Sequence, residues 1–308
     1  MSIAILHEHP QWNEPLFAEM ERRGLDWTSI DASSHGFDPT VVGEWSVLVN
    51  RMSPSAWTRG HLTSMLQTPE FLHNVESVGI PVINGSRSFD FELSKRKQLD
   101  LLRRERVRHP EGRPVLNAGE IVGAAIDLTF PVLVKPNIGG SGAGITEHQS
   151  PDELAAAVDT GLLDDLGPDG VGLVQEKLPA RDNSIVRVEV LGGKFLYAIR
   201  LQLQPGSFNL CPADYCDPAS GIAGAGDLVE AYIPPDRLIA EAARIIEATG
   251  ADLGGVEYLV NDRDGEAYFY DINALSNFVA DAPNVVGFDP FVQLVDLIED
   301  RAKRPALT

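Results

Sequence analysis

A buried strand that carries a lysine and leads directly into a run of glycines constrains this sequence most strongly. Residues 131–136 read Pro-Val-Leu-Val-Lys-Pro, and four of the six residues from Gly139 to Gly144 are glycine. Glycines let the backbone approach a ligand closely and direct several N–H groups at one anion. Lys135, at the end of the strand, adds a positive charge for phosphate oxygens. A flexible hairpin is the alternative, but the cost of burying an unpaired charge favours a phosphate-binding loop.

This segment differs from two other glycine-rich nucleotide loops. A Walker A loop has Gly-Lys-Ser/Thr opening a helix, and no such sequence follows these glycines. A Rossmann fingerprint also leads into a helix, whereas residues 145–147, Ile-Thr-Glu, are β-like. The pattern therefore predicts two strands joined by a loop, and we expect the ligand to contact Lys135, Gly140, Ser141 and Gly142.

Two acidic strands near the end of the chain supply a second constraint. Leu253–Val260 and Ala267–Asn273 are apolar-rich runs separated by a short turn, which predicts a β-hairpin. Asp271 and Asn273 share one face of their strand because they are two positions apart, and the hairpin brings Glu257 beside them. Two carboxylates and an amide carbonyl are hard oxygen ligands that suit Mg²⁺. Solvated strand positions are the alternative, but the apolar neighbours of Asp271 make an unpaired carboxylate there costly.

The order of elements predicts an α/β protein in three parts. Residues 1–90 alternate short apolar strands with helical segments, the pattern of a doubly wound α/β unit. Residues 91–175 hold a basic helix, expected over 92–106, then the lysine strand and the glycine loop. Residues 176–308 hold the later hairpins. The chain thus combines a cation-rich half with a half suited to a metal ion.

The composition argues against several classes of function. Asp and Glu number 45 against 25 Lys and Arg, a formal net charge of −20, and such a surface repels polyanions, which argues against a nucleic-acid partner. No apolar run approaches the ~20 residues that span a bilayer, so we expect no membrane association. The start, Met-Ser-Ile-Ala-Ile-Leu, is expected to be a strand rather than a targeting segment. With two cysteines, too few for a disulfide framework, the expected compartment is the cytoplasm.

Taken in order, these features resemble the ATP-grasp superfamily. They are a lysine-bearing basic helix, a Val-Lys-Pro strand with a glycine loop, a Gln-Glu strand, and late strands with Glu and Asp-x-Asn. The chain is most similar to the RimK-like branch, which is related to glutathione synthetase and D-alanine–D-alanine ligase. The likeness is specific from about Pro81 onward. It implies a Rossmann-like pre-ATP-grasp domain over 1–90 and a two-lobed ATP-grasp fold, with a central subdomain over 91–175 and a C-terminal subdomain over 176–308.

The resemblance implies that two lysines bind the nucleotide phosphates. Lys95 matches the first, although Ser94 replaces the usual aspartate and Lys97 lies close enough to leave the register open. Lys135 matches the second, and the glycines that follow it match the loop that closes over the phosphates.

The resemblance also implies contacts for adenine and ribose. The segment that resembles the adenine-binding hinge strand consists of Gln175, Glu176, Lys177 and Leu178. Family members usually carry an Asp-x-Arg segment after this strand, in which the aspartate holds ribose. Here Arg187 matches the arginine but Ile185 stands at the aspartate position, so Asp182 or Asn183 is the expected substitute.

The catalytic and metal residues come last. Arg200 matches an arginine near the γ-phosphate and the acylphosphate, and Asn209 matches a substrate-loop asparagine that faces the reacting centre. Glu257, Asp271 and Asn273 match the magnesium ligands. The family's Asn-x-Ser-Pro ending becomes Asn273-Ala-Leu-Ser-Asn here, a departure on the acceptor side.

What the resemblance implies is an ATP-dependent carboxylate–amine ligase. Such an enzyme forms an amide or peptide bond through an acylphosphate, uses ATP with Mg²⁺, for which Mn²⁺ is the alternative, and acts on a small-molecule or peptide carboxylate and amine. A kinase that phosphorylates a small molecule and a non-catalytic ATP-binding protein are the alternatives. Many relatives form homo-oligomers, so the resemblance also implies a homo-oligomer.

Three further motifs carry weaker signals. Cys211 and Cys216 are five positions apart without a nearby histidine, so ordinary packing or a substrate-loop contact is favoured over metal binding. His7 and His9 follow the first strand, at the edge where open α/β sheets bind ligands. Arg51 follows another strand of the same sheet and has the geometry to pair with a substrate carboxylate.

Overall fold

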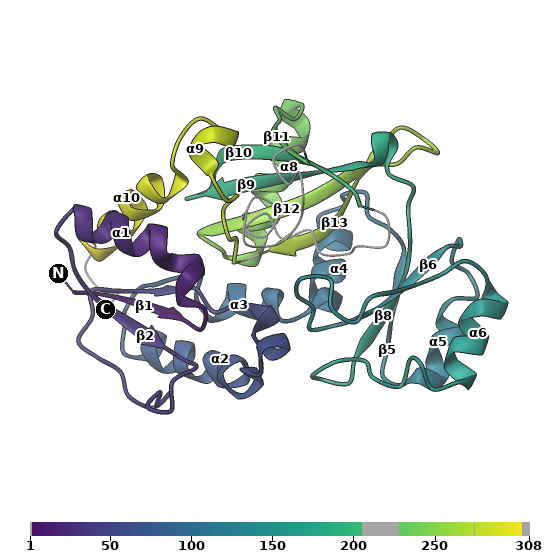
Figure 1. Cartoon of the computed structure of the whole chain (residues 1–308), viewed down its shortest axis with the longest axis horizontal. Helices are drawn as coiled ribbons and strands as arrows, with labels where there is room; N and C mark the ends of the chain where they lie inside the picture. Colours follow the sequence, from purple (N-terminus) through teal and green to yellow (C-terminus); the bar gives the residue numbers. More distant parts are fainter. Residues whose placement is uncertain (1, 205–227, 274, 304–308) are drawn as a thin grey trace.

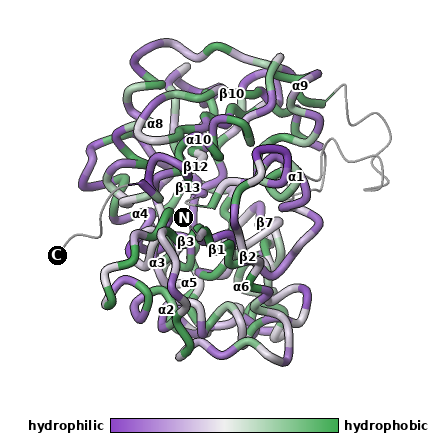
Figure 2. Tube along the Cα trace, turned by 90° about the vertical axis from the view of Figure 1, so that its left-hand side faces the viewer, coloured by the Kyte–Doolittle hydropathy of each residue, from purple (hydrophilic) through white to green (hydrophobic). Residues whose placement is uncertain are grey.

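The computed structural model describes residues 2–204, 228–273 and 275–303. Within these ranges the strands form three sheets, which follow one another along the chain (Figure 1). The mixture of helices and strands confirms the predicted α/β class. No helix in the described ranges is long and apolar enough to cross a membrane, and hydrophilic residues interrupt the apolar ones along the trace in Figure 2.

The first sheet is parallel, with strand order β2-β1-β3-β4. Its strands are β1 (Ser2–His7), β2 (Asp26–Asp31), β3 (Val47–Asn50) and β4 (Val82–Ile83). On β1, Ile3 and Ile5 share a core with helix α1 (Glu14–Arg22). The alternate residues of β1 share a core with helix α2 (Leu62–Ser77) on the other face. Because both faces are covered, the strand is apolar at successive positions.

The second sheet is antiparallel, with strand order β5-β8-β6-β7. Its strands are β5 (Gly112–Val115), β6 (Val132–Pro136), β7 (Thr146–His148) and β8 (Gly172–Glu176). Helices α5 (Ile121–Ala124) and α6 (Pro151–Asp159) share a core with Val132 and Val134 on one face. Since side chains alternate along a strand, Lys135 points to the opposite, uncovered face.

The third sheet is antiparallel, with strand order β11-β10-β9-β12-β13. Its strands are β9 (Ser184–Leu191), β10 (Lys194–Gln202), β11 (Val229–Ala231), β12 (Leu253–Val260) and β13 (Ala267–Asn273). Both bounds of the acidic hairpin are those predicted. Helix α8 (Asp236–Thr249) covers one face, where it packs on Val186, Val188 and Val190. The intervening residues of β9 therefore face the other way.

The predicted basic helix over 92–106 is wrong at its start, because the chain forms two helices there. Helix α3 (Ser86–Glu92) ends just before Ser94, and helix α4 (Lys95–Arg104) begins just after it. Ser94 has an extended backbone, and its hydroxyl accepts a hydrogen bond from the Lys97 N–H at 3.2 Å. A serine in this N-cap position satisfies a helix donor and fixes where the helix begins. As a result, Lys95 occupies the first position of α4.

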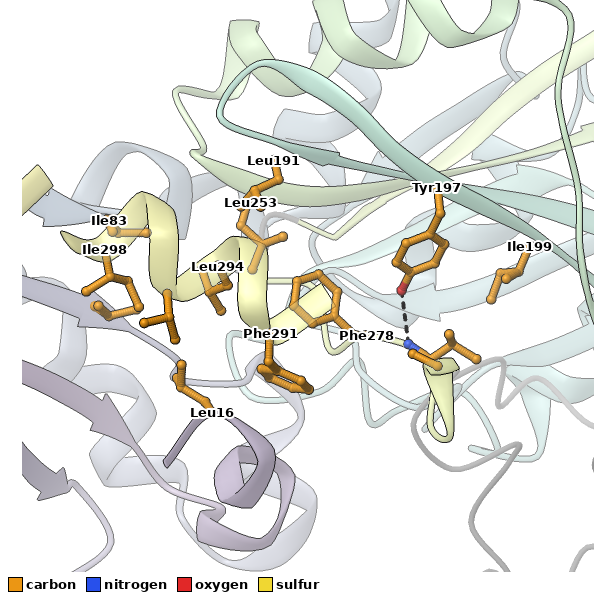
Figure 3. Packing of buried hydrophobic residues seen from close by; sticks show 14 of the residues in the cluster. Leu16, Ile83, Leu191, Tyr197, Ile199, Leu253, Phe278, Phe291, Leu294 and Ile298 are labelled. Carbon is orange, nitrogen blue, oxygen red and sulfur yellow. Dashed lines mark hydrogen bonds between the residues drawn. The ribbon is translucent and has the colours of Figure 1, made fainter. Parts of the chain in front are cut away.

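Helix α10 (Pro290–Ala302), near the end of the chain, packs against the first sheet. In Figure 3, Leu294 and Ile298 of α10 lie among Leu16 of α1, Ile83 of β4 and Leu253 of β12, and all belong to one cluster. The N–H of Val279 donates to the Tyr197 hydroxyl at 3.0 Å at the far end of this core. The first and third sheets thus share one hydrophobic core. Boundaries at residues 90 and 175 stay a prediction.

Candidate active site

A pocket of 780 Å³ is lined by residues from the second and third sheets, from segments that connect their strands, and from segments between the strands of the first sheet. The predicted site residues that line it are Lys95, Lys135, Gly140, Ser141, Gly142, Gln175, Glu176, Lys177, Leu178, Glu257, Asp271 and Asn273. The two lysines, the glycine loop and the acidic hairpin are therefore brought to one space. Its first-domain wall consists of Trp12 and residues 53–55.

Lys135 points into this pocket from β6 and is almost fully buried. Its Nζ donates to the amide oxygen of Gln175 at 2.6 Å, on the neighbouring strand β8. Burial, and then the charge of Lys95, lower the pKa of Lys135 to about 8, although Asp271 and Glu257 oppose the shift. The Gln175 amide, which is the hydrogen-bond partner of Lys135 Nζ in the described part of the chain, carries no charge. A buried ammonium in this setting gains from an anion such as a phosphate.

Lys95 lies at the first turn of α4 and forms an ion pair with Asp271 of β13. Burial alone would lower its pKa, but Asp271, Glu92 and Glu257 raise the pKa above its usual value. The lysine is therefore firmly cationic.

Asn137, which sequence reasoning did not single out, fixes the position of this lysine. The backbone N–H of Lys95 donates to the Asn137 carbonyl at 3.1 Å. The side-chain oxygen of Asn137 accepts from the Ser94 hydroxyl at 3.1 Å and from the Arg96 N–H at 2.9 Å. One asparagine thereby ties the end of the lysine strand to the start of α4. In the sequence, the signal for Asn137 is its position directly after Lys135 and Pro136. Its contacts with the start of α4 appear only in the folded structure.

The acidic hairpin pairs Glu257 with Asp271. Two residues away on each strand, Asn273 pairs with Gly255. Glu257 is buried and accepts hydrogen bonds from the Tyr270 hydroxyl at 2.9 Å and Arg187 Nη1 at 3.2 Å. Burial and the adjacent Asp271 raise the pKa of Glu257 to about 7, with Arg187 opposing. Two carboxylates this close repel each other, and a cation between them would relieve that repulsion.

The donor set fits Mg²⁺ by its chemistry, because carboxylate and amide oxygens are the ligands that this ion takes, together with phosphate oxygens. In the described part of the chain, no group of three or more His, Cys, Asp or Glu side chains is arranged to hold a metal ion. The two carboxylates and one amide of the hairpin are instead the partial set expected when a substrate phosphate completes the coordination sphere.

The glycine loop lies against the first domain. A Cβ atom built on Gly140 would be 2.5 Å from the Ser55 Cβ and 2.6 Å from its Cα, and Gly140 has φ +149°. Only glycine tolerates both the conformation and the approach. The loop consequently closes one side of the pocket against residues 53–55, which also line it.

The predicted adenine segment lines the pocket, but its side chains are engaged with the protein. Glu176 accepts a hydrogen bond from the Thr129 N–H at 2.8 Å, and Lys177 forms an ion pair with Glu147. Gln175 accepts from Lys135, so its side chain points along the phosphate side of the pocket. An adenine role for these residues remains a prediction.

Known proteins with similar sequences were compared with this chain. No protein-family model matches the chain. It is 28% identical over 214 residues to a formate-dependent phosphoribosylglycinamide formyltransferase from Bacteroides thetaiotaomicron, covering 66% of this chain and 50% of that protein. It is 25% identical over 291 residues to a D-alanine–D-alanine ligase from Alkalilimnicola ehrlichii, covering 89% and 83%. The chain spans about half the length of several curated relatives that it matches.

The whole fold matches a solved RimK-domain ATP-grasp protein from Sphaerobacter thermophilus. The TM-score is 0.68 at 19% identity, and the match covers 97% of this chain and 100% of that one. The chain has the ATP-grasp fold. Residues of its second and third sheets line the pocket.

The sequence assigned Arg200 of this ATP-grasp protein to the reacting centre, but the structure places it elsewhere. Arg200 pairs with Val186 across β10 and β9, so its side chain lies on the face that α8 covers. There Arg200 donates to Glu230 at 2.9 Å, and its guanidinium carbon lies 4.1 Å from the Tyr232 ring centroid. It does not line the pocket.

Arg187, in contrast, lines the pocket. It pairs with Glu257 across β9 and β12 and is buried. The sequence offers a signal for it, because Arg187 matches the arginine of the family's Asp-x-Arg segment, but the ligand contact that this segment implies is that of the aspartate with ribose.

Of the other residues predicted to contact a ligand, some line the pocket and some do not. Of the two candidates for ribose, Asn183 lines the pocket and Asp182 does not. Arg51 does not line it either: its guanidinium donates to Asn13, to the Ser276 carbonyl and to the Asn277 side chain. The expected substrate pairing of Arg51 is therefore replaced by a link between the first domain and the segment after β13.

The remaining predictions concern histidines and the segment after β10. His7 is buried and bonds to Ser29 at 2.7 Å, and His9 stacks on Trp12 with ring centroids 4.2 Å apart. Neither histidine lines the pocket. Asn209, Cys211 and Cys216 lie outside the described residues.

Proposed function

We propose that this ATP-grasp protein is an ATP-dependent carboxylate–amine ligase of the RimK-like type. The observation that carries the proposal is the convergence of two cationic side chains, a glycine loop and a hard-oxygen hairpin on one pocket. Lys135 and Gly140 come from β6 and the loop after it, Glu257 and Asp271 come from the hairpin of the third sheet, and Lys95 forms an ion pair with Asp271. This is the arrangement that a triphosphate with a divalent cation requires.

The reaction would proceed in two steps. A substrate carboxylate oxygen attacks the γ-phosphorus of ATP, the bond to the β-phosphate oxygen breaks, and an acylphosphate and ADP form. The amine nitrogen of the second substrate then attacks the acyl carbon, phosphate departs with the electron pair of its C–O bond, and the amine loses a proton. Phosphorylation is needed because a carboxylate anion resists nucleophilic attack.

The side chains would act through charge and position rather than as nucleophiles. Lys135 and Lys95 neutralise phosphate oxygens from two directions. Arg187, which takes the role first predicted for Arg200, stabilises the negative charge on the transferring group. Glu257, Asp271 and Asn273 would hold Mg²⁺, or Mn²⁺, which would supply Lewis-acid stabilisation of that charge. The loop at Gly140, resting on the first domain, excludes water that would hydrolyse an acylphosphate.

The known relatives support this reaction class. D-alanine–D-alanine ligase joins two amino acids by name, and other neighbours include an ATP-grasp ligase solved with a minimal precursor, magnesium and ADP, and a D-cycloserine synthetase. A small-molecule or peptide carboxylate and an amine are accordingly the proposed substrates.

A coupled assay tests the proposal. The purified chain is incubated with Mg·ATP and pairs of amino acids, small carboxylates and amines, while ADP and inorganic phosphate are both measured. Equal release of ADP and phosphate that requires both a carboxylate and an amine supports the ligase. ADP without phosphate identifies a kinase, and the absence of nucleotide binding overturns the assignment of the pocket.

A further inference from the structure

Glu189 is an acid on β9 that is completely buried beside the candidate active site. One carboxylate oxygen accepts a hydrogen bond from Arg187 Nε at 2.7 Å. The other oxygen is buried without a hydrogen-bond partner among the described residues. Glu189 is not needed for nucleotide or metal contacts, because it does not line the pocket. Burying a carboxylate is costly, so its presence calls for a reason.

The guanidinium of Arg187 is shared between two acids. Its Nε bonds to Glu189 at 2.7 Å, whereas Nη1 bonds to Glu257 at the longer distance of 3.2 Å. Nη2 donates to the Ser276 hydroxyl at 2.9 Å. A bond at Nε fixes the plane of the guanidinium, because this planar group presents its donors in a rigid fork. With Nε engaged by Glu189, Arg187 is left a single and longer hydrogen bond to Glu257.

Glu189 also offsets a second buried arginine. Arg51 is buried, and burial lowers its pKa to about 10 while the charge of Glu189 opposes the shift. Arg51 donates to the Ser276 carbonyl at 2.8 Å, so Ser276 is held by both arginines. A single buried acid thus serves two cations that converge on the segment following the metal-binding strand.

We propose that Glu189 is a positioning residue that engages Arg187 Nε, so that Arg187 makes one 3.2 Å hydrogen bond to Glu257 rather than a tight two-point pair, and Glu257 can still hold the divalent cation. This inference rests on the proposed function. Without Glu189, the nearest described carboxylate for Arg187 is Glu257, and two groups of opposite charge in a dry site pair tightly. The arginine and the metal ion would then compete for the same oxygens.

The test measures how much Mg²⁺ is needed to bind a fluorescent ADP analogue. In Glu189→Leu, the half-saturating Mg²⁺ concentration should rise about 10-fold, since adjacent charged groups couple strongly. Glu189→Gln, which keeps an acceptor for Nε but no charge, should show a smaller rise. The double variant Arg187→Met with Glu189→Leu should return the Mg²⁺ requirement to that of the wild type, because no arginine then competes for Glu257.

A matched control comes from the first domain. Glu19 is a similarly buried acid that bonds two arginines, Arg22 and Arg23, on α1. Glu19→Gln should lower thermal stability without altering the Mg²⁺ requirement. If Glu189→Leu does not fold, the comparison of Glu189→Gln with the double variant decides.

Two results overturn the inference separately. An unchanged Mg²⁺ requirement in both Glu189 variants, or a double variant that stays impaired, contradicts the role of Glu189 alone. A wild-type protein that binds no Mg·ADP contradicts the proposed function as well.

Discussion

The two walls of the pocket are built on different physical principles. On the wall from the second sheet, Lys135 is bonded to a neutral amide and is followed by glycines whose backbone is the contact surface. On the wall from the third sheet, Glu257 is held by Arg187 and Tyr270, and Asp271 by Lys95. The lysine on the first wall has a neutral hydrogen-bond partner, whereas the carboxylates on the second wall already bond to cationic side chains. A metal–phosphate ligand would satisfy the first and must displace or share partners on the second.

This difference teaches where a change should matter. On the lysine wall, a single side chain supplies the charge and backbone conformation supplies the rest. On the acidic wall, each ligand oxygen depends on neighbours that hold it. Substitutions on the first wall should therefore act directly on phosphate binding, whereas those on the second should act through rearranged pairs.

The largest effect is expected at Lys135. Lys135→Ala should lower ADP release about 10³-fold, because it removes a buried charge that stabilises the transferring phosphate. A coupled ADP assay measures the loss, and circular dichroism checks that the fold persists. Lys194→Ala, at an exposed lysine of β10, should behave as wild type. Turnover close to normal in Lys135→Ala would show that this wall does not bind the phosphates.

The second-largest effect is expected at Arg187 of β9, which is compared with Arg200 of the adjacent strand β10. Arg187→Met should lower ADP release about 100-fold, the effect of losing one preorganised charge at the transition state. Arg200→Met should change it by less than about threefold, because an exposed pair such as that with Glu230 contributes little. Both rates are measured at saturating nucleotide. The opposite ranking would restore Arg200 to the reacting centre.

The backbone of the lysine wall is tested at Gly140. Gly140→Ala should weaken binding of Mg·ATP about 10-fold, since the new Cβ would overlap the Ser55 backbone and displace the loop. Gly123→Ala serves as the control, because a Cβ there meets nothing within 4 Å. Isothermal titration calorimetry gives both affinities. Equal affinities in the two variants would mean that the loop does not need its contact with the first domain.

The smallest effect is a pH dependence. Burial lowers the pKa of Lys135 to about 8, so its positive charge is lost as pH rises through that value. The affinity for ADP should then fall about threefold between pH 7.5 and 8.5, as one group titrates. Lys135→Arg keeps its charge in this range and should show a flat profile. A profile in the wild type that is equally flat would mean that the lysine stays protonated.

Much of the site could be predicted from the sequence because its elements are local. Lys135 and the glycines are contiguous, and the hairpin β12–β13 has the predicted bounds. The start of α4 was missed because a capping serine, rather than the apolar pattern, decides where that helix begins. Asn137 was missed because its role depends on contact with an element that is distant in the sequence.

By itself, the sequence determined the chemistry of this protein: a strand lysine, a loop that only glycine can form, and three hard-oxygen side chains at fixed spacing. Tertiary structure decided which arginine serves them. The register of β10 on β9 shifts between Phe195 and Tyr197, and such an irregularity changes which face the following side chains occupy. Arg200 consequently lies under α8 while Arg187 reaches the pocket, since the face of a strand depends on its partners and not on its composition.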